Sequence, residues 1–166
     1  MRYVSVDVPP GVSATLESNV VAVKGAKGSA RKEFKVSGIG ISLKDGKFEV
    51  DGKNIKAINT VKRSILKLIE GCSSGFSKRM IIRYAHFPIK VSVKGGAFII
   101  DNFGGEKLQR KANVIGDTKI KIAGQELAIE GPSLDDVTQT VANIRQATKT
   151  KKKDSRVFQD GIYVIE

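Results

Sequence analysis

The chain has 166 residues, and its 29 Lys and Arg residues against 17 Asp and Glu residues give a formal net charge of +12 at pH 7. A hydrophobic content of 40% is sufficient to bury one core or two small ones. Because the sequence has no apolar run of about 18 residues and begins with alternating apolar and polar residues, we expect neither a membrane span nor a signal peptide. The positive charge favours a polyanionic partner, and a nucleic acid is the first to consider.

Few residues suggest chemistry. The single cysteine, Cys72, cannot form an internal disulfide, which is typical of a reducing cytosol, and we expect it to pack as a small hydrophobic residue. The alternative is a hydrolase or transferase that uses Cys72 or the single histidine, His86. No metal-ligand spacing, paired-cysteine motif, nucleophile elbow or Walker loop accompanies them. The sequence therefore predicts no catalytic residue, metal site, cofactor or small-molecule substrate.

The first half has the pattern of antiparallel strands. An alternating run at residues 4–8 ends at Pro9-Pro10-Gly11. Ser18-Asn19 separates two further alternating runs and Asp45-Gly46 separates two more, so two hairpins are expected. Residues 26–29 (Ala-Lys-Gly-Ser) are expected to form a turn, and a phosphate cradle of backbone N–H groups is the alternative.

Each half also contains one amphipathic helix. Apolar residues recur at spacings of 3, 4 and 3 in both: Ile58, Val61, Ile65 and Leu68 in the first helix, and Leu134, Val137, Val141 and Ile144 in the second. Gly71 is expected to end the first helix, and Pro132-Ser133 to begin the second. Lys62, Arg63 and Lys67 lie off the first apolar stripe, where they either contact RNA or are simply solvated.

A strand-like run begins near residue 79, and we place a domain boundary there, which gives domains at 1–78 and 79–166. Hairpins are expected at Gly95-Gly96 and at residues 123–126, and a final strand through Phe158, Ile162 and Val164.

An internal repeat supports the two domains. Two expected hairpins align with each other at a constant offset of 106 residues (118 − 12), and both end in glycine. They are residues 12–25 and residues 118–131. In this alignment the first half has an extra hairpin before its helix. The predicted fold class is α+β, with two similar domains from an internal duplication, each a mostly antiparallel sheet covered by one main helix.

The segment from Lys149 to Val164 is the most basic part of the chain. It combines five cations, Lys149, Lys151, Lys152, Lys153 and Arg156, with an apolar run that can dock as a strand. A polyanion would neutralise this charge, and a solvated lysine face is the alternative. Lys107, Arg110 and Lys111 form a second cluster, suited to contacts with a nucleic acid backbone. We expect Phe158 and Tyr163 to anchor the strand rather than to stack on bases.

These segments resemble a known family. The matching residues are Pro10-Gly11-Val12, 19–28, 71–76, Asn102-Phe103, Gly105-Glu106-Lys107 and 147–164. On these residues the chain is similar to the universal large-subunit ribosomal protein L six family in its archaeal and eukaryotic form, whose eukaryotic member is called L nine. The resemblance implies two similar α+β domains and no enzymatic activity.

The resemblance also implies partners and a place in the cell. It implies direct binding to large-subunit rRNA, mainly by the C-terminal domain, near the sarcin-ricin region where translation factors act. Neighbouring large-subunit ribosomal proteins would be further partners, and the protein would be located in the cytoplasm. Carried over to this sequence, the RNA-binding residues would be the five cations of residues 149–156, followed by Lys107, Arg110 and Lys111. Because charge alone does not distinguish RNA from DNA, a basic DNA-binding or chromatin protein is a further alternative.

Overall fold

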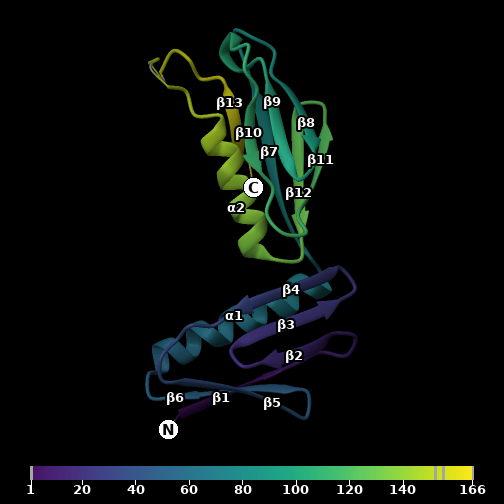
Figure 1. Ribbon diagram of the computed structural model, residues 1–166, viewed down its shortest axis with the longest axis vertical. Helices are drawn as coiled ribbons and strands as arrows, with labels where there is room; N and C mark the ends of the chain where they lie inside the picture. Colours follow the sequence, from purple (N-terminus) through teal and green to yellow (C-terminus); the bar gives the residue numbers. More distant parts are fainter. Residues whose placement is uncertain (1, 152, 155, 166) are drawn as a thin grey trace. The chain divides into compact units, whose positions relative to one another are not determined.

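The computed structural model describes residues 2–151, 153, 154 and 156–165. The chain divides into two compact units: unit 1 runs from the N-terminus to Gly75 and includes Pro132–Leu134, and unit 2 holds the remaining residues. Each unit combines antiparallel sheets with a helix, so the predicted α+β class is confirmed (Figure 1). The expected boundary between residues 78 and 79 falls inside a strand that begins at Phe76. Within the described ranges, no helix is long and apolar enough to cross a membrane.

Unit 1 has, among its described residues, two three-stranded sheets and one helix. Its elements are β1 Arg2–Asp7, β2 Ser13–Glu17, β3 Val20–Gly25, β4 Gly28–Glu33, β5 Ile39–Lys44, β6 Lys47–Gly52 and α1 Ile55–Ser73. The sheet orders are β1-β6-β5 and β2-β3-β4. Both predicted hairpins are confirmed; in the second, Asp45 and Gly46 have φ of 47° and 72°, as a tight two-residue turn requires.

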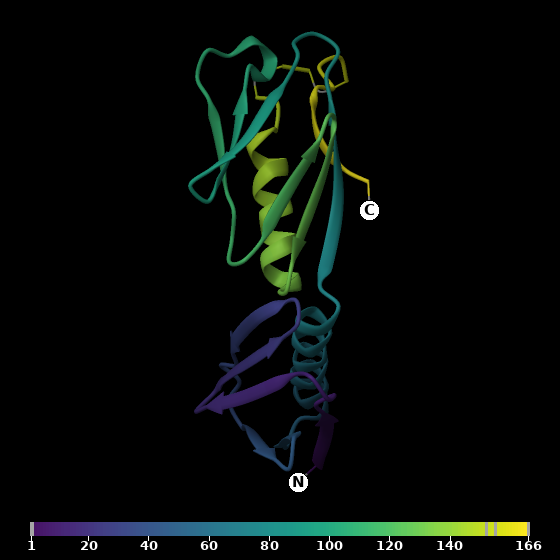
Figure 2. The same cartoon turned by 90° about the vertical axis from the view of Figure 1, so that its right-hand side faces the viewer.

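Helix α1 closes the core of unit 1. It lies against strands of both sheets (Figure 2). Its predicted apolar stripe from Ile58 to Leu68 is buried in the core of this unit. The helix does not end at Gly71, as expected, but at Ser73, because Ile69 and Cys72 also belong to the core. Gly75, with φ of 80°, takes the left-handed conformation instead.

Unit 2 has the same kinds of elements with an added strand. They are β7 Phe76–Arg83, β8 Lys90–Lys94, β9 Ala97–Asp101, the short 3-10 helix η1 Phe103–Gly105, β10 Arg110–Asn113, β11 Lys119–Ala123, β12 Glu126–Gly131, α2 Leu134–Ala147 and β13 Gly161–Val164. The sheet orders are β11-β12-β7-β13 and β10-β9-β8. The buried side chains of α2 pack with those of β7, β12 and β13 in one core.

The two units repeat one topology. The sheet β1-β6-β5 corresponds to β7-β12-β11, and β2-β3-β4 corresponds to β8-β9-β10. The β11–β12 hairpin has the same register as the β5–β6 hairpin. Lys44 pairs with Lys47 in the first hairpin, and Ala123 pairs with Glu126 in the second, so both partners are shifted by 79 residues (123 − 44 and 126 − 47). Leu134 begins α2 as Ile55 begins α1, again 79 residues apart (134 − 55). The predicted duplication is therefore visible in strand order, register and helix position.

The predicted alignment of the repeat was wrong. An offset of 106 pairs β2–β3 with β11–β12, whereas the topology pairs β5–β6 with β11–β12. The second half does have a hairpin before its helix, and no hairpin is extra in the first half. Strand β4 was also missed, because its charged run Arg31-Lys32-Glu33 conceals the single buried side chain of Ala30.

We expect the core of unit 1 to depend on Ile65, which is fully buried in α1, but not on its neighbour Leu66, which is 43% exposed. Replacing Ile65→Ala should lower the free energy of unfolding by about 2–5 kcal/mol through a smaller side chain and a cavity. Leu66→Ala should change it by about 0.5 kcal/mol or less. Urea unfolding followed by circular dichroism measures both, and equal effects would contradict the assignment of the buried face.

Candidate nucleic-acid interface

Two segments distinguish unit 2 from unit 1: one connection that is longer than its counterpart, and one segment that has no counterpart. The connection from β9 to β10 spans residues 102–109, whereas the equivalent connection from β3 to β4 is only Ala26-Lys27. Residues 148–160, which we name the arm, join α2 to the added strand β13. The arm contains most of the cations predicted to bind RNA. Its placement therefore sets where those cations lie.

Arg110, at the start of β10, holds the first part of the arm. Its Nη1 donates hydrogen bonds to the backbone carbonyl oxygens of Ala147 at 2.8 Å and Lys149 at 3.0 Å. Its Nε and Nη2 donate hydrogen bonds to the carboxylate of Glu106, with Nε at 2.8 Å from Oε2. The guanidinium carbon also lies 4.2 Å from the centre of the Phe103 ring. With these partners and a side chain only 18% exposed, Arg110 acts as an anchor of the arm.

Glu106 compensates the charge of this anchor. The hydrogen bonds from the Arg110 side chain hold the pKa of Glu106 below its ordinary value, so this carboxylate is ionised at neutral pH. The Arg110–Glu106 pair is thus neutral overall. Sequence reasoning placed Arg110 with Lys107 and Lys111 as an RNA contact, whereas the structure shows its donors turned to the protein's own carbonyl and carboxylate oxygens.

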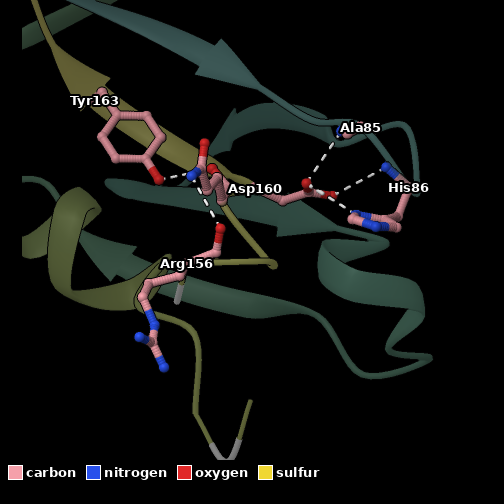
Figure 3. Close-up of polar contacts among 6 residues, drawn as sticks. Ala85, His86, Arg156, Asp160 and Tyr163 are labelled. Carbon is pink, nitrogen blue, oxygen red and sulfur yellow. Dashed lines mark hydrogen bonds and ion pairs between the residues drawn. The ribbon is translucent and has the colours of Figure 1, made fainter. Parts of the chain in front are cut away.

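Asp160 holds the far end of the arm. The residue is buried, with 8% of its surface exposed. Its carboxylate accepts hydrogen bonds from the backbone N–H groups of Ala85 at 3.0 Å and His86 at 3.4 Å (Figure 3). The ring Nδ1 of His86 lies 3.3 Å from Oδ1. Burial by itself would raise the pKa of Asp160, but these hydrogen bonds outweigh burial and keep the pKa below its ordinary value. His86 had no acidic partner nearby in sequence, and this partner comes 74 residues later.

Aromatic contacts complete the docking of the arm. The Phe158 ring lies 5.1 Å from the His86 ring, and the Lys153 ammonium lies 4.8 Å from the centre of the same Phe158 ring. Phe158 was expected in the final strand, but β13 begins only at Gly161. Tyr163 does lie in β13, 45% exposed, and its hydroxyl donates to the carbonyl oxygen of Gln159 at 2.6 Å.

The described cations of the arm are exposed. Lys149, Lys151, Lys153 and Arg156 are exposed, whereas Lys152 lies outside the described residues. Figure 3 shows the guanidinium group of Arg156 pointing away from the buried Asp160. It pairs with Asp154 at 3.2 Å, and its hydrogen bonds lower the pKa of that carboxyl. This pair is a surface contact within the arm.

The structure brings only some of the predicted cations together. Lys151 and Lys153 line a cleft with Arg110, and Phe87 and Phe103 are also among its lining residues. Lys111 lies elsewhere, in a shallow groove with residues of α2. Lys107 is exposed on the loop between β9 and β10. The resulting surface is a basic loop and arm at one end of unit 2.

The site contains charge rather than reactive groups. Over the described ranges, no group of three or more His, Cys, Asp or Glu side chains could hold a metal ion. Cys72 is fully buried in unit 1, its thiol donates to the Val23 carbonyl oxygen, and burial raises its pKa. The fold and the exposed arm define a class: a small, basic, duplicated α+β protein whose anchored loops present cations.

Comparisons with known proteins give the family. A sequence model described as Ribosomal protein L6 matches residues 87–161, which include the loop and the arm. The chain is 41% identical to large ribosomal subunit protein uL6 of Methanosarcina mazei over 98% of this chain and 95% of that protein. It is 41% identical to the protein of the same name from Methanococcus vannielii, over 97% of this chain and 91% of that protein. It is 39% identical to the one from Archaeoglobus fulgidus, over 97% of this chain and 87% of that protein. The chain therefore belongs to the ribosomal protein L6 family, which confirms the resemblance found in the sequence.

Arg110→Lys tests the anchor without changing net charge. A lysine has its three donors on a single nitrogen and lacks the planar fork with which Arg110 binds the Glu106 carboxylate through Nε and Nη2 while Nη1 donates to two carbonyl groups, so the arm should be less well held. We expect a loss of about 1–3 kcal/mol in the free energy of unfolding and weaker binding to large-subunit rRNA. Lys111→Arg, the adjacent charge-conserving change, should alter neither. RNA affinity in Arg110→Lys equal to that of the wild type would show that Arg110 does not position the arm.

Asp160→Asn tests the second anchor through its pH dependence. Because the pKa of Asp160 is depressed in the folded state, its stabilising contribution is complete above the unfolded pKa of about 4 and is lost as pH falls through the lower folded value. The variant should be less stable than the wild type by about 1–3 kcal/mol at pH 7, and the difference should shrink towards pH 3. Denaturant unfolding at both pH values measures this, with the exposed Asp117→Asn as a control. A difference that is the same at both pH values would rule out the ionised carboxylate as its source.

Proposed function

We propose that this protein is a structural component of the large ribosomal subunit, supports translation there, and binds large-subunit rRNA directly through the arm of unit 2. The names of its relatives support the first part of the proposal. The second part is supported by one observation: the arm is held to unit 2 at both ends by Arg110 and Asp160, while its described lysines, Lys149, Lys151 and Lys153, are exposed. The fold holds cations in place, and it performs no chemistry in this role.

The anchors favour binding through preorganisation. A free lysine-rich segment would lose conformational entropy on binding, whereas an arm already fixed at Ala147, Lys149 and Asp160 has less to lose. Each phosphate that a lysine neutralises releases counterions, so affinity should fall with salt at a slope of about −0.7 to −0.9 per neutralised phosphate. The proposed RNA-binding residues are Lys149, Lys151, Lys152, Lys153 and Arg156, followed by Lys107 and Lys111, with Arg110 as the residue that positions them.

The chemistry of this surface favours recognition of RNA shape. Only 6% of the residues are aromatic and none is Trp, so stacking of successive bases along a single strand has few platforms. Lysine ammonium groups bind phosphates as point charges, and A-form RNA presents its backbone more readily than its deep groove. The proposed target is therefore structured RNA. Following the family resemblance, we place it near the sarcin-ricin region, beside other ribosomal proteins and close to where translation factors act in the cytoplasm.

Replacing Lys151, Lys152 and Lys153 by Ala tests the arm directly. Exposed charges contribute little to folding, so the melting temperature should stay nearly unchanged. Affinity for purified large-subunit rRNA should fall, and the salt slope should flatten by about two to three, or about one for each phosphate that is no longer neutralised. Filter binding over a KCl series measures both quantities.

The matched control removes three exposed lysines elsewhere in unit 2, Lys90, Lys94 and Lys119. It should leave the salt slope close to that of the wild type. A sharp drop in melting temperature with intact RNA binding would mean that the arm lysines are structural. Equal affinity of the wild type for rRNA and for duplex DNA at the same salt would favour a DNA-binding protein instead.

A further inference from the structure

The arm accounts for the positive charge of only one unit. Residues 1–75 contain 13 Lys and Arg and 7 Asp and Glu, and residues 76–166 contain 16 and 10, so each half carries a net charge of +6 (13 − 7 and 16 − 10). Unit 1 has no arm and no long basic loop among its described residues. Some of its lysines are paired: Lys35 with Glu33, Lys44 with Glu49, and Lys47 with Asp7. The excess charge must therefore lie elsewhere in unit 1.

Three of the remaining cations of unit 1 form a row on the outer face of α1. At 3.6 residues per turn, Lys56, Arg63 and Lys67 fall within about 40° of one another around the helix axis, opposite the buried stripe, and they span about 16 Å along it. All three are exposed. None of them is in an ion pair with another described residue, and the only acidic residue of the helix is Glu70 near its end. We name these three residues the α1 row.

The duplication provides an internal control for the α1 row. The equivalent positions of α2, 79 residues later, are Asp135, Ala142 and Gln146. The buried positions, in contrast, match in kind, since Ile58 corresponds to Val137 and Ile65 to Ile144. Helix α2 therefore occupies the same place in the same topology without the cations. The fold does not require them.

The α1 row also opposes the intrinsic preferences of a helix. Acidic residues stabilise the first turn and basic residues the last, each by about 0.3–1 kcal/mol. Helix α2 follows this rule, with Asp135 and Asp136 in its first turn and Arg145 in its last. Helix α1 has no acidic residue in its first turn and no basic residue in its last, and Lys56 lies near its N-terminus. Arg63 and Lys67 are moreover a like-charge pair four residues apart, which is destabilising.

We infer that the α1 row is a second RNA-binding surface, on unit 1, which contacts a phosphate backbone of large-subunit rRNA. This inference rests on the proposed function. A phosphate backbone is favoured over an acidic protein because the face between the cations is small and polar, with Asn59 and Thr60 exposed. Protein interfaces need a buried apolar or aromatic centre, and the only large apolar side chain exposed on the described part of this helix is Leu66. The three cations of the α1 row destabilise the free helix, and the phosphate groups of bound RNA would neutralise their charge.

The test compares two triple variants of the full chain that each remove three positive charges. The first, Lys56→Gln with Arg63→Ala and Lys67→Gln, changes the α1 row and introduces Ala and Gln at the last two positions, as in α2. The second, Lys35→Gln with Lys44→Gln and Lys47→Gln, changes the three paired lysines of unit 1. Binding to purified large-subunit rRNA is measured over a KCl series, and thermal unfolding is followed by circular dichroism.

We expect the α1-row variant to be at least as stable as the wild type and to bind rRNA with a salt slope flatter by about two to three. The control variant should change the slope by less than about one. An unchanged slope in the α1-row variant, or equal losses in both variants, would overturn the inference. Normal rRNA binding combined with failure to enter large subunits in cells would also overturn it, in favour of an acidic protein partner.

The same assay separates this inference from the proposed function. If the α1-row variant loses affinity while the arm variant at Lys151, Lys152 and Lys153 does not, the row is confirmed and the arm assignment fails. If only the arm variant loses affinity, the arm is confirmed and the row fails. Because the two surfaces lie on different units, their effects on the salt slope should add when both sets of changes are combined.

Discussion

The placement of the basic arm depends on the contacts of one partly buried cation, Arg110. Its guanidinium group binds the carbonyl oxygens of Ala147, at the end of α2, and of Lys149 in the arm, together with the carboxylate of Glu106. It also lies over the Phe103 ring. A segment with several neighbouring lysines repels itself, so it will not stay folded against a protein unless other contacts hold it there. Arg110 and Asp160 supply those contacts, and they act on the backbone rather than on the lysine side chains. The side chains of Lys149 and Lys151 therefore stay exposed.

The duplication separates what the fold requires from what each unit adds. Both units share strand order, hairpin register and the buried face of the helix. They differ in the β9–β10 loop, the arm with β13, and the charges on the outer helix face. These differences are the places where function is to be sought, because the other unit folds without them. The same comparison identifies the arm on unit 2 and the α1 row on unit 1.

Much of the fold could be predicted from local sequence patterns. The Asp45-Gly46 turn, the two helical stripes and the two-domain α+β organisation depend on neighbours in sequence, and all were confirmed. The repeat was aligned wrongly because every two-residue hairpin has the same local alternation. Only the long-range pairing of β1 with β6 and of β7 with β12 identifies equivalent strands.

The site was predictable in composition but not in arrangement. A run of lysines is plain in the sequence, but which basic residue faces inward is decided by contacts across the fold. Arg110 lies 37 residues from Ala147, and His86 lies 74 from Asp160. One signal was present: an arginine among lysines, four residues after a glutamate, suits bidentate pairing better than a lysine does. Asp160, before the final strand, carried no comparable signal.

The most direct test of the account is the reactivity of individual lysines towards an amine-modifying reagent, measured by mass spectrometry in the free protein and in its complex with large-subunit rRNA. The account predicts strong protection of Lys149, Lys151 and Lys153 in the complex and little change at Lys35, Lys44 and Lys90. Equal reactivity of the arm lysines in the two states would contradict it.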